Sequence, residues 1–467
     1  MAIVNFVHRI LDFKRLSPAQ KIAISFMFVI LSGAVLLMLP ISNRNGEFFS
    51  PIDALFTATS ATCVTGLSTI TIAEQFNWFG HLVIVLLIQI GGLGLMTFMA
   101  VLLLILKNRL SVNEKIVMKE MLNQDKVFDM KKFLLDILRY TLFFEAIGAI
   151  LISFRMIDVY GPVDGVLKAA FLSVSAFCNA GFDTLGPISM QGYVHDPLMM
   201  FTIMSLIVLG GVGFAVWFDV RDKLGMLVRK KINFKKFRHS LTLHTRIVIL
   251  VTVFLILGAG LLIMLIEYDN PLTIGTFTLP DKMMSATFES VALRTAGFTS
   301  INYANLRTGT QLIMMITMFI GGSPGGTAGG IKTTTFAILV IYMISMLKGR
   351  ENTVVMRRNI GKGVIIRAMG IFFINLFTLF TGIFFLCLLE DKPMNALCFE
   401  AVSAMATVGS SLGITAALTF GGKIVIILLM YIGRIGISTL IISLVKPRHS
   451  HDAKDKVNYP DGTIIVG

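Results

Sequence analysis

Four short segments of the chain share a residue pattern whose chemistry would be the binding of a cation by backbone oxygen atoms. Each ends in a glycine, each has an alanine five residues before that glycine, and three have a serine six residues before it. The serines are Ser60, Ser175 and Ser403, and Val291 stands at that position in the third segment. Successive glycines are 112 to 116 residues apart, which indicates an internal repeat. We call these the four glycine segments: 56–66, 171–181, 287–297 and 399–409.

The chemistry depends on the last residues of each segment. Glycine adopts backbone angles that other residues resist, so the chain there can aim carbonyl oxygens at a common axis. Rings of carbonyl oxygens replace the hydration shell of potassium in selective filters. Divalent ions favour carboxylates, and none occurs at these positions of the sequence. We expect a potassium filter at the backbone carbonyls of Thr65, Gly66, Ala180, Gly181, Ala296, Gly297, Val408 and Gly409, flanked by Val64, Asn179, Thr295 and Thr407.

Close packing of helices is the alternative role for such glycines, because small residues let membrane helices approach one another. This alternative is strongest for a second glycine motif, which recurs 24 to 29 residues beyond each glycine segment. It is weaker for the glycine segments, which fall in outward connections rather than on helix faces. The second motif occurs at 90–94, 209–213, 320–324 and 432–436.

The third copy of the second motif opens into a glycine-rich loop, 321–332. Six glycines and a proline within ten residues cannot hold a helix. We interpret the loop as a gate beneath the filter; a packing break and a nucleotide-binding loop are the alternatives, and no strand pattern precedes it. Its residues are Gly321, Gly322, Ser323, Pro324, Gly325, Gly326, Thr327, Ala328, Gly329, Gly330 and Lys332.

Arg434 takes the place of a motif glycine within the last apolar run. A charged residue inside a membrane span is costly and therefore a functional candidate. Facing the pore, Arg434 would oppose cations and hold the loop by donating to its carbonyls; the alternative is an ion pair with Glu289 or Glu400. Lys332 could instead extend to the inner surface. Arg294, three residues before a segment glycine, is expected to support the filter from behind.

The composition of the chain indicates that it is a membrane protein whose helices position these residues. Of 467 residues, 55% are hydrophobic and 15% charged, against about 25% charged in a soluble domain. This excludes a soluble enzyme, a disordered protein and a secreted disulfide scaffold. Apolar runs near the length of a membrane-spanning helix number eight: 19–39, 81–106, 133–154, 198–220, 245–266, 311–347 (interrupted), 364–389 and 423–445.

Basic residues show which connections face inward. Of 41 lysines and arginines, 30 lie in the two terminal segments and in every second connection. The positive-inside rule assigns these parts to the cytoplasm, both termini included. A nucleic-acid-binding surface would not leave alternate connections poor in basic residues. The basic segments are 1–21, 107–132, 221–246, 348–367 and 446–467.

We therefore predict an all-α polytopic membrane protein with four parallel repeats of helix, re-entrant pore loop and helix around a pseudo-fourfold axis. It would have eight transmembrane helices and four pore half-helices of about ten residues, too short to cross. The expected units are an N-terminal cytoplasmic segment 1–18, pore repeats 19–106, 107–220, 221–347 and 348–445, and a cytoplasmic tail 446–467. The plasma membrane is the expected location.

Neither catalysis nor a resident metal is indicated. The four cysteines form no CxxC pair, and the seven histidines form no metal-ligand cluster in the sequence. An enzyme would need a nucleophile, base or metal set at one membrane face. The remaining hypotheses are a gated potassium-uptake pore and a sodium-coupled potassium symporter on the same scaffold.

These motifs resemble the Trk/Ktr/HKT superfamily of potassium transporters along essentially the whole chain. The matching stretches are 62–66, 179–182, 294–298, 406–409, the glycine-rich loop and the Gly433-Arg434 pair. In that family the four glycines form the potassium filter, the broken helix is an intramembrane gating loop, and an arginine of the last helix lies beside it. With Gly66 at the first filter position, the resemblance favours potassium over sodium.

The resemblance also implies partners. TrkH-type relatives have two additional N-terminal helices, whereas about 18 residues precede the first run here, so the chain resembles the translocating subunit of a bacterial Ktr-type system. Such a subunit forms a homodimer on a cytoplasmic ring of nucleotide-binding regulatory subunits. We expect potassium, and possible sodium, as transported ions, with no nucleotide bound by this chain. The basic loops could contact the ring or anionic lipids.

Overall fold

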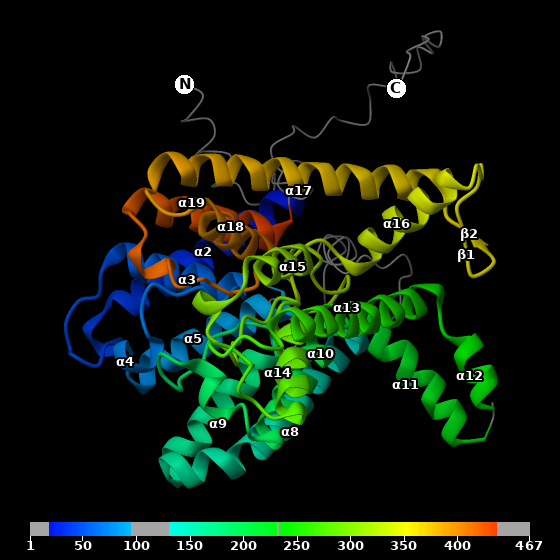
Figure 1. Cartoon of the computed structure of the whole chain (residues 1–467). Coiled ribbons are helices and arrows are strands. Elements are labelled where there is room, and N and C mark those ends of the chain that lie inside the picture. Colours follow the sequence, from blue (N-terminus) through cyan, green and yellow to red (C-terminus); the bar gives the residue numbers. More distant parts are fainter. Residues whose placement is uncertain (1–17, 95–129, 231–232, 437–467) are drawn as a thin grey trace.

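A computed structural model describes residues 18–94, 130–230 and 233–436 (Figure 1). Nearly all regular structure in this part of the chain is helical. A two-residue antiparallel pair, β1 (Val354–Val355) with β2 (Arg358–Asn359), forms a small hairpin between two helices. Residues 1–17, 95–129, 231–232 and 437–467 lie outside the described part of the chain, and with them most of the expected basic segments 1–21, 107–132 and 446–467.

Long and short helices alternate along the chain. Four long helices are α2 (Pro18–Met38), α8 (Met130–Tyr160), α13 (Leu243–Glu267) and α17 (Lys362–Leu389). Each is followed by a short helix that runs into a glycine segment: α3 (Pro51–Cys63), α9 (Pro162–Phe177), α14 (Leu279–Ala292) and α18 (Met394–Ala406). A third helix follows in each group: α5 (Trp78–Leu93), α10 (Pro197–Gly211), α15 (Thr308–Phe319) continued by α16 (Thr333–Leu347), and α19 (Phe420–Ile435).

Small elements fill the connections. The helices are α4 (Ile72–Gln75), α11 (Phe214–Val228) and α12 (Phe234–Ser240), and the 3-10 turns are η1 (Pro40–Ser42), η2 (Ser189–Tyr193), η3 (Tyr303–Asn305) and η4 (Thr415–Ala417).

The short helices begin and end for local reasons. A proline stands in the first turn of α3, α9 and α14 and at the N-cap of α18, where its missing N–H costs no helical hydrogen bond. They have 13 to 16 residues, so the expected length of about ten was an underestimate. At a rise of ~1.5 Å per residue they still fall short of a ~30 Å hydrocarbon core.

Contacts among the helices form a closed circuit. Each short helix packs against the long helix before it, and the third helix of one group packs against the short helix of the next group. The connecting pairs are α5 with α9, α10 with α14, α15 with α18, and α19 with α3. The last pair joins the end of the described chain to its beginning and completes the circuit.

Part of the expected set of eight spans can be compared with the described helices. Among the described helices, three are long and apolar enough to cross a membrane, namely Gln20–Met38, Leu243–Glu267 and Lys362–Leu389. The expected span 198–220 is not one straight helix, because α10 and α11 meet within it at a bend of 100°. Gly213 takes a φ of +94° at this bend, and the Phe214 N–H donates to the Gly325 carbonyl, 3.0 Å away. The bend therefore lies directly against the glycine-rich loop.

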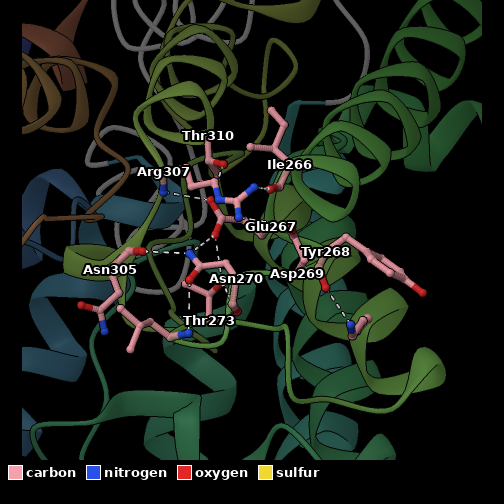
Figure 2. A network of polar contacts seen from close by, with 11 residues as sticks. Ile266, Glu267, Tyr268, Asp269, Asn270, Thr273, Asn305, Arg307 and Thr310 are labelled. Atoms are coloured by element: carbon pink, nitrogen blue, oxygen red, sulfur yellow. Dashed lines mark hydrogen bonds and ion pairs between the residues drawn. The ribbon is translucent and has the colours of Figure 1, made fainter.

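The far end of α13 is fastened to the start of α15 by a buried carboxylate. Figure 2 shows side chains converging on Glu267, which is fully buried. Asn270 and Thr273 donate to its Oε2, while the Arg307 N–H donates to Oε1 at 3.0 Å. Glu390 at the end of α17 does the same for α19 by accepting the N–H of Thr419, its N-cap residue, at 2.8 Å.

Candidate functional site

The glycines that end the four glycine segments meet in a closed ring. A Cβ added to any one of them would collide with the carbonyl oxygen that precedes the next glycine. At Gly66 that Cβ would lie 2.6 Å from the oxygen of Ala180, and at Gly181 it would lie 2.6 Å from that of Ala296. The ring then continues from Gly297 to the Val408 oxygen and from Gly409 back to the Thr65 oxygen. Segments more than 100 residues apart therefore place four carbonyls side by side.

All four segments share an uncommon backbone conformation. The residue two before each glycine has a positive φ, as does the glycine itself. The values are 57° at Val64, 60° at Asn179, 70° at Thr295 and 51° at Thr407. Such angles are costly for residues other than glycine, above all β-branched ones, and persist only where the surroundings enforce them. The surroundings here are the ends of the short helices and the neighbouring segments of the ring.

Backbone hydrogen bonds hold three segments in the same turn. The residue before the glycine donates its N–H to the carbonyl five positions earlier, at 2.8 Å from Thr65 to Ser60 and 2.7 Å from Ala180 to Ser175. The fourth segment repeats the bond at 2.8 Å. In the third segment Ala296 donates instead to Ala292, four positions earlier, at 2.8 Å. The short helices thus end with their carbonyl termini beside the ring, which favours positive charge there.

The second glycine motif packs against these helix ends. A Cβ at Gly91, Gly210 or Gly433 would collide with the carbonyl four residues before a ring glycine. The carbonyls belong to Thr62, Phe177 and Met405, so the packing interpretation describes these three motif glycines. Their absent side chains let α5, α10 and α19 approach the short helices closely.

The helix break predicted at 321–332 is confirmed, since α15 ends at Phe319 and α16 begins at Thr333. Backbone bonds close the base of the loop: Gly321 N–H to the Ile331 carbonyl and Thr333 N–H to the Gly322 carbonyl, both 3.0 Å. The Lys332 amino group donates to the Ala328 carbonyl at 2.8 Å. In this conformation the Lys332 side chain is therefore bonded within the loop.

The loop lies directly against the glycine segments. Thr327 Oγ1 donates to Asn179 Oδ1 at 3.1 Å, and the Gly329 N–H donates to Thr295 Oγ1 at 3.2 Å. Gly329 also abuts the Thr407 side chain closely. Asn179, Thr295 and Thr407 each precede a ring glycine by two residues, so the loop touches three of the four segments at the same level.

Arg434 links the loop to α5, which belongs to the same group of helices as the remaining glycine segment, 56–66. Its guanidinium donates to the Thr327 carbonyl at 2.6 Å and to the Gly91 carbonyl at the end of α5. The alternative ion pair is wrong, because the described partners of Glu289 are Ser300 and Tyr303, and Glu400 accepts a hydrogen bond from Thr415. Bonding to loop carbonyls is the role that the sequence predicted; Gly91 as the second acceptor was not predicted.

Two other side chains are buried near the ring. Arg294 at the end of α14 is 3% exposed, and its own carbonyl accepts a hydrogen bond from Asn179 Nδ2 at 3.3 Å. Ser410, just after the fourth ring glycine, is fully buried. No cluster of three histidine, cysteine, aspartate or glutamate side chains suited to a metal ion occurs within residues 18–94, 130–230 and 233–436. The ring offers neutral oxygen ligands only.

Comparison with known proteins gives concordant matches. The profile of the TrkH family, described as a cation transport protein, matches residues 7–454. The chain is 39% identical to the Ktr system potassium uptake protein B of Bacillus subtilis, over 98% of this chain and 99% of that protein. It is 40% identical to the potassium/sodium uptake protein NtpJ of Enterococcus hirae, over 97% and 98% of the two chains.

A solved structure matches the fold. The crystal structure of the potassium transporter TrkH from Vibrio parahaemolyticus superimposes with a TM-score of 0.67 at 20% identity. The match covers 90% of this chain and 84% of that one. At this identity the likeness concerns the fold alone, an all-helical membrane architecture.

Proposed function

Because the chain belongs to the TrkH family of cation transport proteins, we propose that it is the potassium-translocating membrane subunit of a Ktr-type uptake system. Near-complete coverage of two curated relatives, both named as potassium uptake proteins, supports this. Its work is transport rather than catalysis.

The proposed selectivity filter is the ring of carbonyls at Thr65, Ala180, Ala296 and Val408, together with the four ring glycines and their flanking residues. The single observation that carries this proposal is the closed ring of contacts between the glycine segments. Carbonyl dipoles and helix C-termini stabilise a monovalent cation that has shed its water.

The fold proposal follows from the closed helix circuit. Four groups, each with a long helix, a short re-entrant helix and a third helix, would surround a pseudo-fourfold axis along which ions pass. Irregular backbone at membrane depth is tolerated where it lines a polar cavity, which suits the four turns after the short helices. The units proposed are 19–106, 107–220, 221–347 and 348–445, with eight spans and both termini in the cytoplasm.

The glycine-rich loop is the proposed gate. It contacts three glycine segments and is bridged to α5 by Arg434, so in this conformation it lies across the proposed exit of the filter. A positive guanidinium beside the path opposes cations. Opening would require the Arg434 hydrogen bonds to break and the loop to move aside.

The proposed partners are a second copy of the chain and a cytoplasmic ring of nucleotide-binding regulatory subunits. Membership of a Ktr system, as named for the Bacillus relative, supports a regulatory subunit. The basic connections are the proposed contact surfaces for this ring and for anionic lipids.

A second candidate function is sodium-coupled or sodium-permeable transport on the same scaffold. The Enterococcus relative is named as a potassium/sodium uptake protein, and this name supports the second candidate function. Both functions use the same ring, and they differ in the ion dependence of the flux.

Growth complementation tests the proposal. A bacterium deficient in potassium uptake would express the chain at low potassium, with and without sodium and a Ktr regulatory subunit. Potassium-dependent growth supports uptake, and a strict requirement for sodium supports the coupled alternative. Absence of growth with protein present in the membrane and the regulatory subunit co-expressed would contradict the proposed function.

A further inference from the structure

We infer that the hydroxyl groups of Ser60 and Ser403 position the proposed filter by fixing the direction of the Thr65 and Val408 carbonyls. This inference rests on the proposed function. Both serines are fully buried in short helices, six residues before a ring glycine. They would not touch the ion; they would act through the peptide groups that do.

The contact is the same in both segments. Ser60 Oγ accepts the N–H of Gly66 at 3.1 Å, and Ser403 Oγ accepts the N–H of Gly409 at 3.1 Å. A peptide group is planar and trans, so its N–H and its C=O point in opposite directions. The Gly66 N–H shares a peptide group with the Thr65 carbonyl. Fixing that N–H toward the short helix therefore turns the carbonyl away from it.

The fixed carbonyls lie against the neighbouring segments of the ring. The Thr65 oxygen lies against the Cα region of Gly409, and the Val408 oxygen lies against that of Gly297. A carbonyl so placed attracts a cation, whereas a peptide group turned over would present an N–H and repel it. Turning over is sterically permitted beside glycine, since Gly66 and Gly409 both have a φ of +97° and carry no side chain. The serine hydroxyls oppose that rotation.

The second and third segments lack this hydrogen bond. In the third, Val291 occupies the serine position, and the Gly297 N–H donates to the Ala292 carbonyl at 3.2 Å instead. In the second, the buried Ser175 hydroxyl has no hydrogen-bond partner among the described residues. Three serines at equivalent positions thus differ in one contact, and Ser175 serves as a matched control for the other two.

The test compares Ser60→Ala and Ser403→Ala with Ser175→Ala in the full chain with its regulatory subunit. The readout is the ratio of the apparent KM values for potassium and sodium uptake. Loss of one hydrogen bond to a neutral partner predicts a fall in potassium preference of about three- to tenfold for S60A and S403A. S175A should keep the wild-type preference, and Ser60→Thr, which retains the hydroxyl, should recover it.

Two results would overturn the inference. One is equal potassium preference in S60A, S403A and S175A; the other is a parallel loss of uptake for both ions with an unchanged ratio, which indicates structural damage alone. Potassium-dependent thermal stabilisation of the purified proteins gives the same comparison without transport. Potassium uptake by the wild-type chain is measured first. If the wild-type chain takes up no potassium, the result contradicts the proposed function rather than this inference.

Discussion

At the scale of single residues, the four glycine segments can meet in a ring because the ring glycines carry no side chain. Each ring glycine has a positive φ and presses against the backbone of the next segment. A side chain there would be strained by its backbone angle and would collide with a carbonyl oxygen. Glycine thus permits the close approach of four carbonyls.

Gly66→Ser is expected to lower the preference for potassium over sodium. The new Cβ would lie within 2.6 Å of the Ala180 oxygen, so the carbonyl must shift, and the hydroxyl competes with it for the ion. Competitive uptake of the two ions measures the effect. Gly46→Ser is the control, since Gly46 also has a positive φ, of 68°, but nothing within 4 Å of an added Cβ. Unchanged selectivity in G66S would contradict the filter assignment.

At the scale of elements, the loop between α15 and α16 is ordered by contacts made outside its own helix pair. Its backbone N–H groups at Ser323 and Thr327 donate to carbonyls at the end of α10, at 3.0 and 3.2 Å. Thr327 is also the residue that accepts from Arg434. Glycine-rich sequence leaves the loop free to move, and these few contacts hold it across the proposed path.

Deleting 325–328 is expected to raise potassium flux, because it removes the Thr327 contacts to Asn179 and Arg434. Arg434→Ala should act in the same direction. Radioactive rubidium or potassium uptake into vesicles, normalised to inserted protein, measures the change. A deletion of equal length in the exposed connection before α3, 45–48, is the control. Equal or lower flux in the loop deletion would indicate that the loop is structural.

At the scale of the whole molecule, the closed helix circuit depends on contact between its first and last groups. Besides the packing of α19 on α3, Lys423 and Asp53 form an ion pair at 2.7 Å, with side chains 13% and 17% exposed. A pair this sheltered from water is screened less than a surface pair.

Lys423→Met and Asp53→Asn are each expected to lower the free energy of unfolding by about 1–3 kcal/mol, between the values for exposed and buried pairs. The double variant should lose less than the sum, because neither charge is then left unpaired. Thermal unfolding in detergent measures all three. Breaking the exposed Arg221–Asp222 pair should have little effect, and strict additivity at Lys423 and Asp53 would contradict the coupling.

The proposed regulatory subunit leads to a prediction for the assembled molecule. The purified chain alone should show no response of its flux to ATP or ADP, and the response should appear when a Ktr regulatory subunit is added to the same vesicles. The reason is that the sequence offers no nucleotide-binding fingerprint. A nucleotide response of the isolated chain would contradict this division of labour.

Much of this protein could be determined from its sequence alone. Apolar runs and sparse charge identified an all-helical membrane protein, since the bilayer accepts little else. The helix break at 321–332 was predictable because glycine and proline act locally. The position of Arg434 beside the loop was predictable in outline, since a charge inside a span must find a partner.

Only the tertiary structure decided which partner each group finds. Arg434 donates to the carbonyl of Gly91, 343 residues away, rather than to either candidate glutamate. The bend after α10 lies at the motif glycine Gly213, but its contact with the loop, from the Phe214 N–H to the Gly325 carbonyl, could not be read from the apolar run. Ser60 and Ser175 share one motif position, yet one hydroxyl is bonded and the other is not. Composition and local propensity act between neighbours in sequence, whereas hydrogen-bond choice depends on which distant backbone groups packing brings within about 3 Å.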